Sequence, residues 1–236
     1  MAWIIGDVHG CIKTLESLLK KLPKVDKVIF VGDLIDRGEN SKEVVQLVRD
    51  SSYDCVLGNH ELSMIENGEL LLGNPKEIET NIWTSKKYDI GGMQTLSSYK
   101  RAKDPINEFK NDIDWMKTLP LYLEYPDIKD NNGRYLVVTH SYVDDLWNKR
   151  DSNDQFDKDN FKTKVLYSRN KEPKDNKEIF NIFGHTPVSD PIIKNHFANI
   201  DTGAYYTNKD LGVLTALEFP SMRIIQQENI DTIQSH

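Results

Sequence analysis

The first sixty residues alternate between short apolar runs that stop near a glycine and longer stretches whose apolar residues recur at helical spacing. The apolar runs predict strands over 2–5, 27–31 and 54–57. The stretches between them predict helices over 11–22 and 41–50, and another helix near residue 60. Ser41 is the expected N-cap of the second helix, because its hydroxyl can accept a hydrogen bond from a free backbone N–H group. Strands joined by helices in this order predict an α/β fold with a parallel sheet.

The rest of the chain predicts a helical middle and a second half rich in strands. Residues 62–118 are expected to be mostly helical, with a break at Gly91 and Gly92. Further strands are expected at 121–125, 134–139, 179–183, 191–194, 197–200, 211–218 and 222–226. Residues 148–178 are charged and poor in apolar groups, which indicates a surface excursion with one short helix, and the polar end from Gln227 is expected to fray.

Composition and charge exclude several classes of protein. No apolar run approaches the roughly 20 residues that cross a bilayer, and residues 1–7 lack the basic leader and apolar stretch of a secretory signal. The two cysteines, Cys11 and Cys55, are too few for a disulfide framework, so we expect a reduced, cytoplasmic setting. The net charge of −7 argues against nucleic acid as the main partner. We expect a monomer that does not bind membranes.

Five short segments place a side chain that can bind a metal just after a predicted strand, in most cases beside a glycine. They are Gly6-Asp7-Val8-His9-Gly10, Gly32-Asp33-Leu34-Ile35-Asp36-Arg37-Gly38, Gly58-Asn59-His60-Glu61, Thr139-His140-Ser141 and Gly184-His185-Thr186. Functional side chains of parallel sheets gather at the carboxyl ends of strands, where glycine permits sharp turns. A mixture of Asp, Asn and His suits manganese, iron or zinc better than calcium or magnesium. Asp33 is the expected bridge between two ions, because it follows the central one of three motif strands.

The charge of such a site fits a phosphate. Two divalent ions, the carboxylates of Asp7 and Asp33 and a bridging hydroxide leave about one net positive charge, and Arg37 adds a planar donor fork for phosphate oxygens. Metal binding makes hydroxide available near neutral pH. The leaving oxygen needs a proton, which His60 can supply while Asp36 keeps the imidazole protonated and oriented.

Taken in this order, the segments resemble the phosphoprotein phosphatase family of calcineurin-like metallophosphoesterases, and above all its bacterial and phage branch, typified by the lambda phage serine/threonine protein phosphatase. Ile182-Phe183-Gly184-His185-Thr186-Pro187 and Asn199-Ile200-Asp201-Thr202-Gly203-Ala204 match it as well. The resemblance implies two mixed β-sheets packed face to face and flanked by helices. It also implies two divalent metal ions, Mn²⁺ in the first place, with Fe or Zn as alternatives. Because the motifs extend from position 7 to 203, we expect one catalytic domain over 1–236.

The resemblance further implies a role for each motif residue. The first metal ion would be bound by Asp7, His9 and Asp33, and the second by Asp33, Asn59, His140 and His185. His60 would be the general acid, Asp36 its partner and Arg37 a phosphate ligand. Leu166-Tyr167-Ser168-Arg169 is similar to the segment that carries a second phosphate-binding arginine, although the family commonly has Trp where Tyr167 stands, so Arg169 is the candidate.

Two residues in or near these motifs are expected to have supporting roles: Glu61 as a hydrogen-bonding support and Asp201 as the residue that fixes a turn. Trp83, Trp115 and Trp147 are expected to be core or rim residues. The leading hypothesis is a phosphomonoesterase that hydrolyses phosphoserine and phosphothreonine in proteins by in-line attack of water. A symmetrical diadenosine tetraphosphate hydrolase is the second enzyme hypothesis. It is disfavoured because that branch tends to lack the second aspartate of the GDLIDRG segment, which is Asp36 here, and to have Asp after GNH, where this chain has Glu61. A broad small-molecule phosphatase and a catalytically inactive metal-dependent scaffold are further alternatives.

Overall fold

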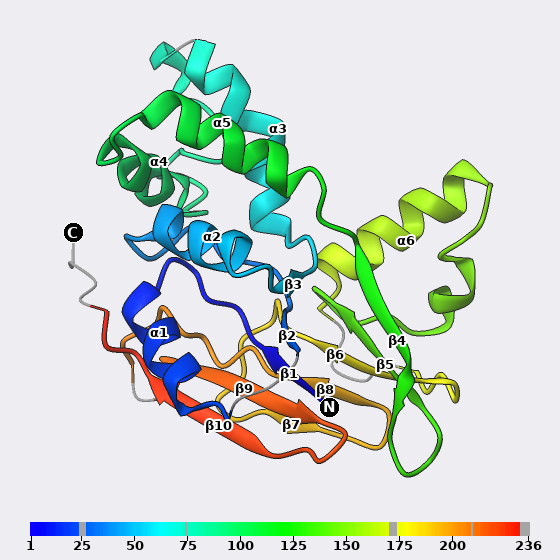
Figure 1. Ribbon diagram of the computed structural model, residues 1–236. Coiled ribbons are helices and arrows are strands. Elements are labelled where there is room, and N and C mark those ends of the chain that lie inside the picture. Colours follow the sequence, from blue (N-terminus) through cyan, green and yellow to red (C-terminus); the bar gives the residue numbers. More distant parts are fainter. Residues whose placement is uncertain (24–26, 74, 170–173, 209, 232–236) are drawn as a thin grey trace.

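Two five-stranded mixed sheets pack face to face and carry helices on their outer sides (Figure 1). The computed structural model describes residues 1–23, 27–73, 75–169, 174–208 and 210–231. None of the helices in these ranges has the length and apolarity that crossing a bilayer requires. The expected α/β sandwich of two mixed sheets is therefore confirmed.

The first sheet has the strand order β10-β9-β1-β2-β3. Its strands are β1 (Ala2–Ile5), β2 (Val28–Phe30), β3 (Asp54–Cys55), β9 (Val213–Phe219) and β10 (Ile224–Glu228). The three strands from the start of the chain run parallel, whereas β9 is antiparallel to both β1 and β10. β2 therefore lies between β1 and β3, as the motif order predicted.

The second sheet has the strand order β4-β5-β6-β8-β7. Its strands are β4 (Tyr122–Lys129), β5 (Tyr135–Thr139), β6 (Ile179–Phe183), β7 (Ile192–Ile193) and β8 (Phe197–Asn199). Strands β5, β6 and β8 are parallel, and β4 and β7 are antiparallel edges. The carboxyl ends of β5 and β6 thus lie at one edge of this sheet, next to each other.

The two-residue period of the strands divides the core into layers. Ala2 and Ile4 of β1 face the second sheet and pack with Val138 and Ile182 from it. The alternate residues of β1, of which Trp3 is the largest, face the helices on the other side. The sandwich is therefore apolar on both faces of the first sheet, which explains the unbroken apolar run at the start of the chain.

Five helices cover the first sheet or extend from that side, and one covers the second sheet (Figure 1). They are α1 (Ile12–Lys21), α2 (Ser41–Asp50), α3 (Asn59–Gly73), α4 (Gly92–Lys100), α5 (Pro105–Met116) and, on the second sheet, α6 (Gln155–Tyr167). Short 3₁₀ turns, η1 (Pro75–Glu77) and η2 (Asp145–Lys149), precede α4 and α6. The helical middle of the chain and the break before α4 are as predicted, and Gly91 has a left-handed backbone (φ 104°) that only glycine adopts readily.

Two predictions about local structure were wrong. Ser41 is not an N-cap: Asn40 holds that position, and the Ser41 hydroxyl accepts a hydrogen bond from the Asp36 backbone N–H instead. Within the described residues, the polar end is ordered: Gln227 lies in β10, and the Asp231 carboxylate accepts a hydrogen bond from the Thr14 backbone N–H at the start of α1. The final residues, 232–236, lie outside the described ranges.

The excursion over 148–178 also contains more structure than expected. Its helix α6 has 13 residues, and it packs Phe161, Val165 and Leu166 onto the outer face of the second sheet. Asp154 caps this helix by accepting a hydrogen bond from the Asp157 backbone N–H. These three apolar residues attach to the sheet a helix in which five of the 13 residues are charged.

Candidate metal centre

The site is built at the carboxyl ends of the parallel strands. Asp7 follows β1, Asp33 follows β2, and Asn59 begins α3 shortly after β3. His140 and His185 follow β5 and β6 of the facing sheet. Because both sheets present these ends to the same region, side chains separated by up to 178 positions come together, as the His185 N–H to Asp7 Oδ2 hydrogen bond of 3.0 Å shows.

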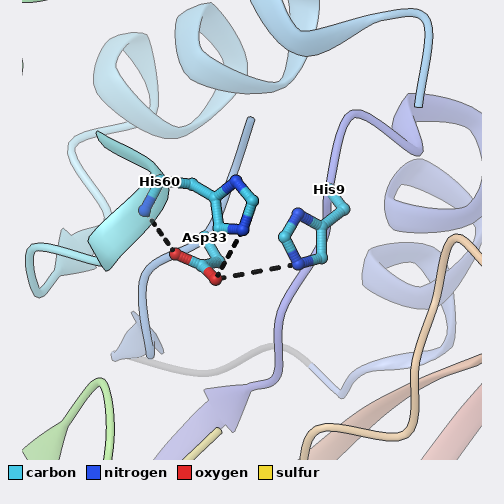
Figure 2. Close-up of side chains that lie close together, drawn as sticks. All are labelled: His9, Asp33 and His60. Carbon is cyan, nitrogen blue, oxygen red and sulfur yellow. Dashed lines mark hydrogen bonds and ion pairs between the residues drawn. The ribbon is translucent and has the colours of Figure 1, made fainter. Parts of the chain in front are cut away.

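The first cluster consists of His9, Asp33 and His60 (Figure 2). Asp33 Oδ2 lies 3.7 Å from His9 Nε2 and 3.8 Å from His60 Nε2. The His60 backbone N–H donates to Asp33 Oδ1 at 3.1 Å, which fixes the carboxylate against the start of α3. The three side chains are buried.

The second cluster shares Asp33 with the first and adds His140 and His185. His140 Nε2 lies 3.4 Å from Asp33 Oδ2, 3.1 Å from His185 Nδ1 and 2.8 Å from Asn59 Oδ1. Four candidate ligands therefore surround one point. Asp33 is the only residue common to both groups, which is the arrangement expected of a bridging carboxylate.

Asp7 lies after β1, where its Oδ2 accepts a hydrogen bond from the His185 backbone N–H. Its Oδ1 is buried without a hydrogen-bond partner, and so is His185 Nε2. Burial raises the pKa of Asp7 well above its usual range, and the negative charges of Asp201 and Asp33 raise it further. Buried polar atoms without partners are costly, and a buried carboxylate oxygen without one, on a residue whose other oxygen bonds the His185 N–H, fits a site that a positive ion would fill.

The histidines are in a form that can bind metal. The Nδ1–H groups of His9 and His140 donate to the backbone carbonyls of Ile35 and Val31, both at 2.8 Å, so the Nε2 lone pairs face the site. Burial lowers the pKa of His9 to about 3 and also lowers that of His140, so both rings are neutral near pH 7. The donor set of oxygen and neutral nitrogen therefore fits a pair of transition-metal ions.

His60 differs from the other histidines. Burial opposes its charge, but Asp33 and Asp36 outweigh burial and raise its pKa to about 9. Its Nδ1 lies 2.7 Å from Asp36 Oδ2, so this nitrogen carries the proton. Proximity alone would count His60 as a ligand of the first cluster, whereas its protonation and its carboxylate partner suit a proton donor.

Asp36 is fully buried and has two further partners that the sequence did not reveal. The Trp83 Nε1–H group and the Thr95 hydroxyl both donate to its carboxylate. Trp83 is indeed a buried residue, but it lies in direct contact with the predicted acid–base pair. The only sequence signal was an aromatic residue with a polar N–H group in an otherwise polar stretch.

The two arginines that the sequence singled out, Arg37 and Arg169, differ in how the structure holds them. The Arg37 guanidinium donates to the Asp89 backbone carbonyl, forms an ion pair with the Asp89 carboxylate (3.4 Å) and lies 5.5 Å from the ring centroid of Tyr205. Arg169 is exposed. Burial and His140 lower the pKa of His185 to about 3, and the positive charge of Arg169 acts in the same direction, so this guanidinium lies within electrostatic range of the second cluster.

Glu61 and Asp201 occupy the supporting positions predicted for them. Glu61 accepts hydrogen bonds from the backbone N–H groups of Asp33 (2.8 Å), Leu34 (2.8 Å) and Gly58 (3.0 Å), and so fixes the turn after β2. Asp201 accepts one from the Gly203 backbone N–H at 2.9 Å. No side chain could replace hydrogen at Gly58, because a Cβ there would collide with the Asp33 and Glu61 carboxylates.

Backbone strain is concentrated at the same place. Among the described residues, eight other than glycine have a positive φ, and five of them belong to the site. These five are His9, Asp33, Asp36, Arg37 and His185. Left-handed backbone at such residues costs free energy and persists where a site requires a particular side-chain direction.

The fold and the two clusters define a metal-dependent hydrolase. The family model for calcineurin-like phosphoesterases matches residues 2–231, so the chain belongs to that family. Two relatives, from Oceanobacillus iheyensis and Halalkalibacterium halodurans, are 29% and 30% identical to it. Both are bis(5'-nucleosyl)-tetraphosphatases of the PrpE type, described as asymmetrical, and the alignments cover 94% of this chain and 90% and 91% of theirs.

A solved structure described as a candidate diadenosine tetraphosphatase has the same fold. It superposes with a TM-score of 0.63 at 21% sequence identity, over 98% of this chain and 94% of the other. The calcineurin-like part of the predicted resemblance is therefore confirmed. The more specific likeness to the lambda phage protein phosphatase is not what these relatives indicate.

Proposed function

We propose that this protein is a metal-dependent hydrolase that cuts a phosphoanhydride bond of dinucleoside polyphosphates. The proposal rests on the site itself, two buried clusters that share Asp33, together with relatives that carry this activity in their names over nearly their whole length. It follows the second enzyme hypothesis from the sequence, with one change. The relatives are described as asymmetrical, so AMP and ATP are the proposed products, where the symmetrical reaction would give two ADP.

The chain's own residues have distinct parts in this proposal. Asp7, His9 and Asp33 would hold one metal ion, and Asp33, Asn59, His140 and His185 the other. We propose Mn²⁺, because the ligands combine carboxylate, amide and imidazole groups. When bound, the ions would lower the pKa of water and neutralise phosphate charge.

Arg37 and Arg169 would bind phosphate oxygens from outside the clusters. Their guanidinium groups are planar donor forks, which suits a phosphate presented between them. His60 would donate the proton on Nε2 to the leaving oxygen, and Asp36 would hold the ring in place through Nδ1.

There is room beside the site for a long substrate. A cavity of about 790 Å³ borders Asp89, the partner of Arg37, and its lining includes Lys86 and Arg101. An enzyme that cuts the dinucleotide at its first phosphate must accommodate the remaining triphosphate and its nucleoside. The two cations of the cavity could face that polyphosphate, although Glu39 lines it as well.

Hydrolysis of phosphoserine or phosphothreonine in proteins is the second candidate, and the contact between Asp36 and His60 favours it. An alkoxide leaving group needs a proton, whereas a nucleotide leaves as a phosphate anion that is stable near neutral pH.

Action as a cytoplasmic monomer, without nucleic-acid or membrane partners, stays a prediction.

A substrate panel tests the proposal. The metal-loaded protein is offered diadenosine tetraphosphate, a phosphothreonine peptide and p-nitrophenyl phosphate, and products are separated by chromatography. We expect fastest turnover of the dinucleotide, with AMP and ATP in equal amounts. Turnover should be lost with chelator and also in the Asp33→Asn variant. The loss in the variant excludes a contaminating enzyme. ADP as the sole product would mean symmetrical cleavage, and faster release from the peptide would favour the second candidate. No turnover of any substrate would favour the scaffold.

A further inference from the structure

The carboxylate of Asp36 receives hydrogen bonds from three side chains at once. His60 Nδ1 lies 2.7 Å from Oδ2, Trp83 Nε1 lies 2.9 Å from Oδ2 and 3.2 Å from Oδ1, and the Thr95 hydroxyl lies 2.6 Å from Oδ1. Both oxygens therefore accept, and the plane of the carboxylate is fixed from more than one direction. A carboxylate held by His60 alone could turn about its own side-chain bonds, and the imidazole could turn with it.

The backbone of the same residue is held by the same group of side chains. The Asp36 N–H is shared between Ser41 Oγ and Thr95 Oγ1, both at 3.0 Å. The Thr95 hydroxyl donates its only hydrogen to the Asp36 carboxylate, so it must accept from the Ser41 hydroxyl, which lies 3.0 Å away. The donors and acceptors of this network can therefore all be satisfied at once, and every member is buried.

The two extra donors come from the helical region between α3 and β4. Trp83 lies in the irregular stretch before α4, and Thr95 lies within α4. Gly91, between them, packs against the backbone of Arg37, where a Cβ would collide with the Arg37 nitrogen. This region therefore docks directly on the segment that carries Asp36.

We propose that Trp83 and Thr95 are positioning residues of the reaction, which hold Asp36 so that His60 points its Nε2 proton into the site. The inference rests on the proposed function, because it assumes that His60 protonates the leaving group. The rival explanation is that the two side chains merely attach the helical region to the sandwich. A positioning role affects proton donation in particular, whereas an attachment role affects stability and all substrates alike.

Leaving-group dependence separates the two explanations. Metal-loaded Trp83→Phe and Thr95→Val are compared with wild type on phenyl phosphate, which has a poor leaving group, and on p-nitrophenyl phosphate, which has a good one. We expect kcat for phenyl phosphate to fall roughly tenfold, with KM little changed, because imperfect orientation forfeits part of the gain from general acid catalysis. The p-nitrophenyl rate should fall by no more than about threefold.

Matched variants complete the test. Thr95→Ser keeps the hydroxyl and should restore the phenyl phosphate rate. Trp147→Phe removes another buried indole whose Nε1–H donates to the Tyr135 hydroxyl at the α6 side, and it should leave the rate ratio of the two substrates unchanged. In a His60→Ala background, Trp83→Phe should cause no further loss in that ratio.

Several outcomes would overturn the inference. One is an equal loss of kcat on both substrates in Trp83→Phe and Thr95→Val. Another is a phenyl phosphate rate for Thr95→Ser no better than that of Thr95→Val. The third is that Trp83→Phe changes the rate ratio in the His60→Ala background as much as it does in wild type. Should Trp83→Phe fail to fold, the Thr95 pair decides alone, because valine and serine change little volume. If wild type hydrolyses nothing, the proposed function fails and this inference with it. If His60→Ala alters the substrate ratio but the Trp83 and Thr95 variants do not, only this inference fails.

Discussion

Raising the pH should destabilise the metal-free protein, and His60 sets most of the effect. Asp33 and Asp36 outweigh burial and raise the pKa of His60 from 6.5 to about 9. A group with a higher pKa in the folded state binds its proton more tightly there. Its stabilising contribution is therefore complete below pH 6.5 and is lost as the pH rises through 9. The shift corresponds to about 3 kcal/mol of unfolding free energy.

Glu61 and Asp201 act mainly below the window between pH 7.5 and 9, whereas burial also raises the pKa values of Asp7, Cys11 and Cys55, which add a decline of the same sign that wild type and His60→Gln share. Burial raises the pKa values of Glu61 and Asp201 to about 7, so their stabilising contributions, of the same sign, are mostly lost below that window. Burial lowers the pKa values of His9 and His185 to about 3, and these rings change charge on unfolding only below pH 6.5. The His60 contribution to the slope in the window should approach about 1.4 kcal/mol per pH unit, the value for one proton.

The assay is urea unfolding of chelator-treated protein at several pH values from 7 to 9, for wild type and His60→Gln. Wild type should lose stability steadily, and His60→Gln should lose distinctly less, because only the decline due to Asp7, Cys11 and Cys55 remains. Excess Mn²⁺ should abolish or reverse the trend, because metal binding displaces protons and strengthens as the pH rises. A constant or rising stability in metal-free wild type, or the same slope in His60→Gln, would refute the reasoning.

Three further predictions concern other parts of the chain. Elemental analysis should show that Asp33→Asn weakens retention of both metal ions, whereas Asp7→Asn weakens one, since only Asp33 belongs to both clusters. Arg37→Ala should raise KM for the phosphorylated substrate by roughly tenfold through loss of a charge-assisted phosphate contact, while Asp89→Ala should have a smaller effect, because the Asp89 backbone carbonyl still holds Arg37. Asp231→Ala should lower the free energy of unfolding by about 1 kcal/mol without changing kcat, because it removes a helix cap distant in sequence.

Much of the site could be predicted because its signals are local. An apolar run that ends at glycine and is followed by Asp or His predicts both a strand and a functional side chain at its carboxyl end. Asp7 and Asp33 are of this kind, and the order of the parallel strands then brings them to one edge of the sheet. His140 and His185 needed the second sheet as well, which only the resemblance supplied.

The contributions that were missed come from residues whose partners lie far away in sequence. Nothing near Trp83 or Thr95 indicates Asp36, which is 47 and 59 positions away. Ser41 is a residue type that often caps helices, but its hydroxyl accepts a hydrogen bond from the Asp36 backbone N–H instead. Asp231 caps α1 from 217 positions away, whereas Cys11, at the N-cap position, makes no side-chain cap hydrogen bond.

The contact between Asp36 and His60 bears directly on which bond the enzyme cuts. General acid catalysis gains most where the leaving group is a strong base. An alkoxide of serine is one, whereas a nucleotide phosphate, with a pKa near 6, is not. His60→Ala should therefore slow a phosphomonoester of an alcohol far more than diadenosine tetraphosphate. If the dinucleotide is the faster substrate yet His60→Ala slows both equally, His60 acts mainly by stabilising the charge around Asp33. An unequal loss would identify it as the proton donor, and the donors that hold Asp36 would then be part of the catalytic design.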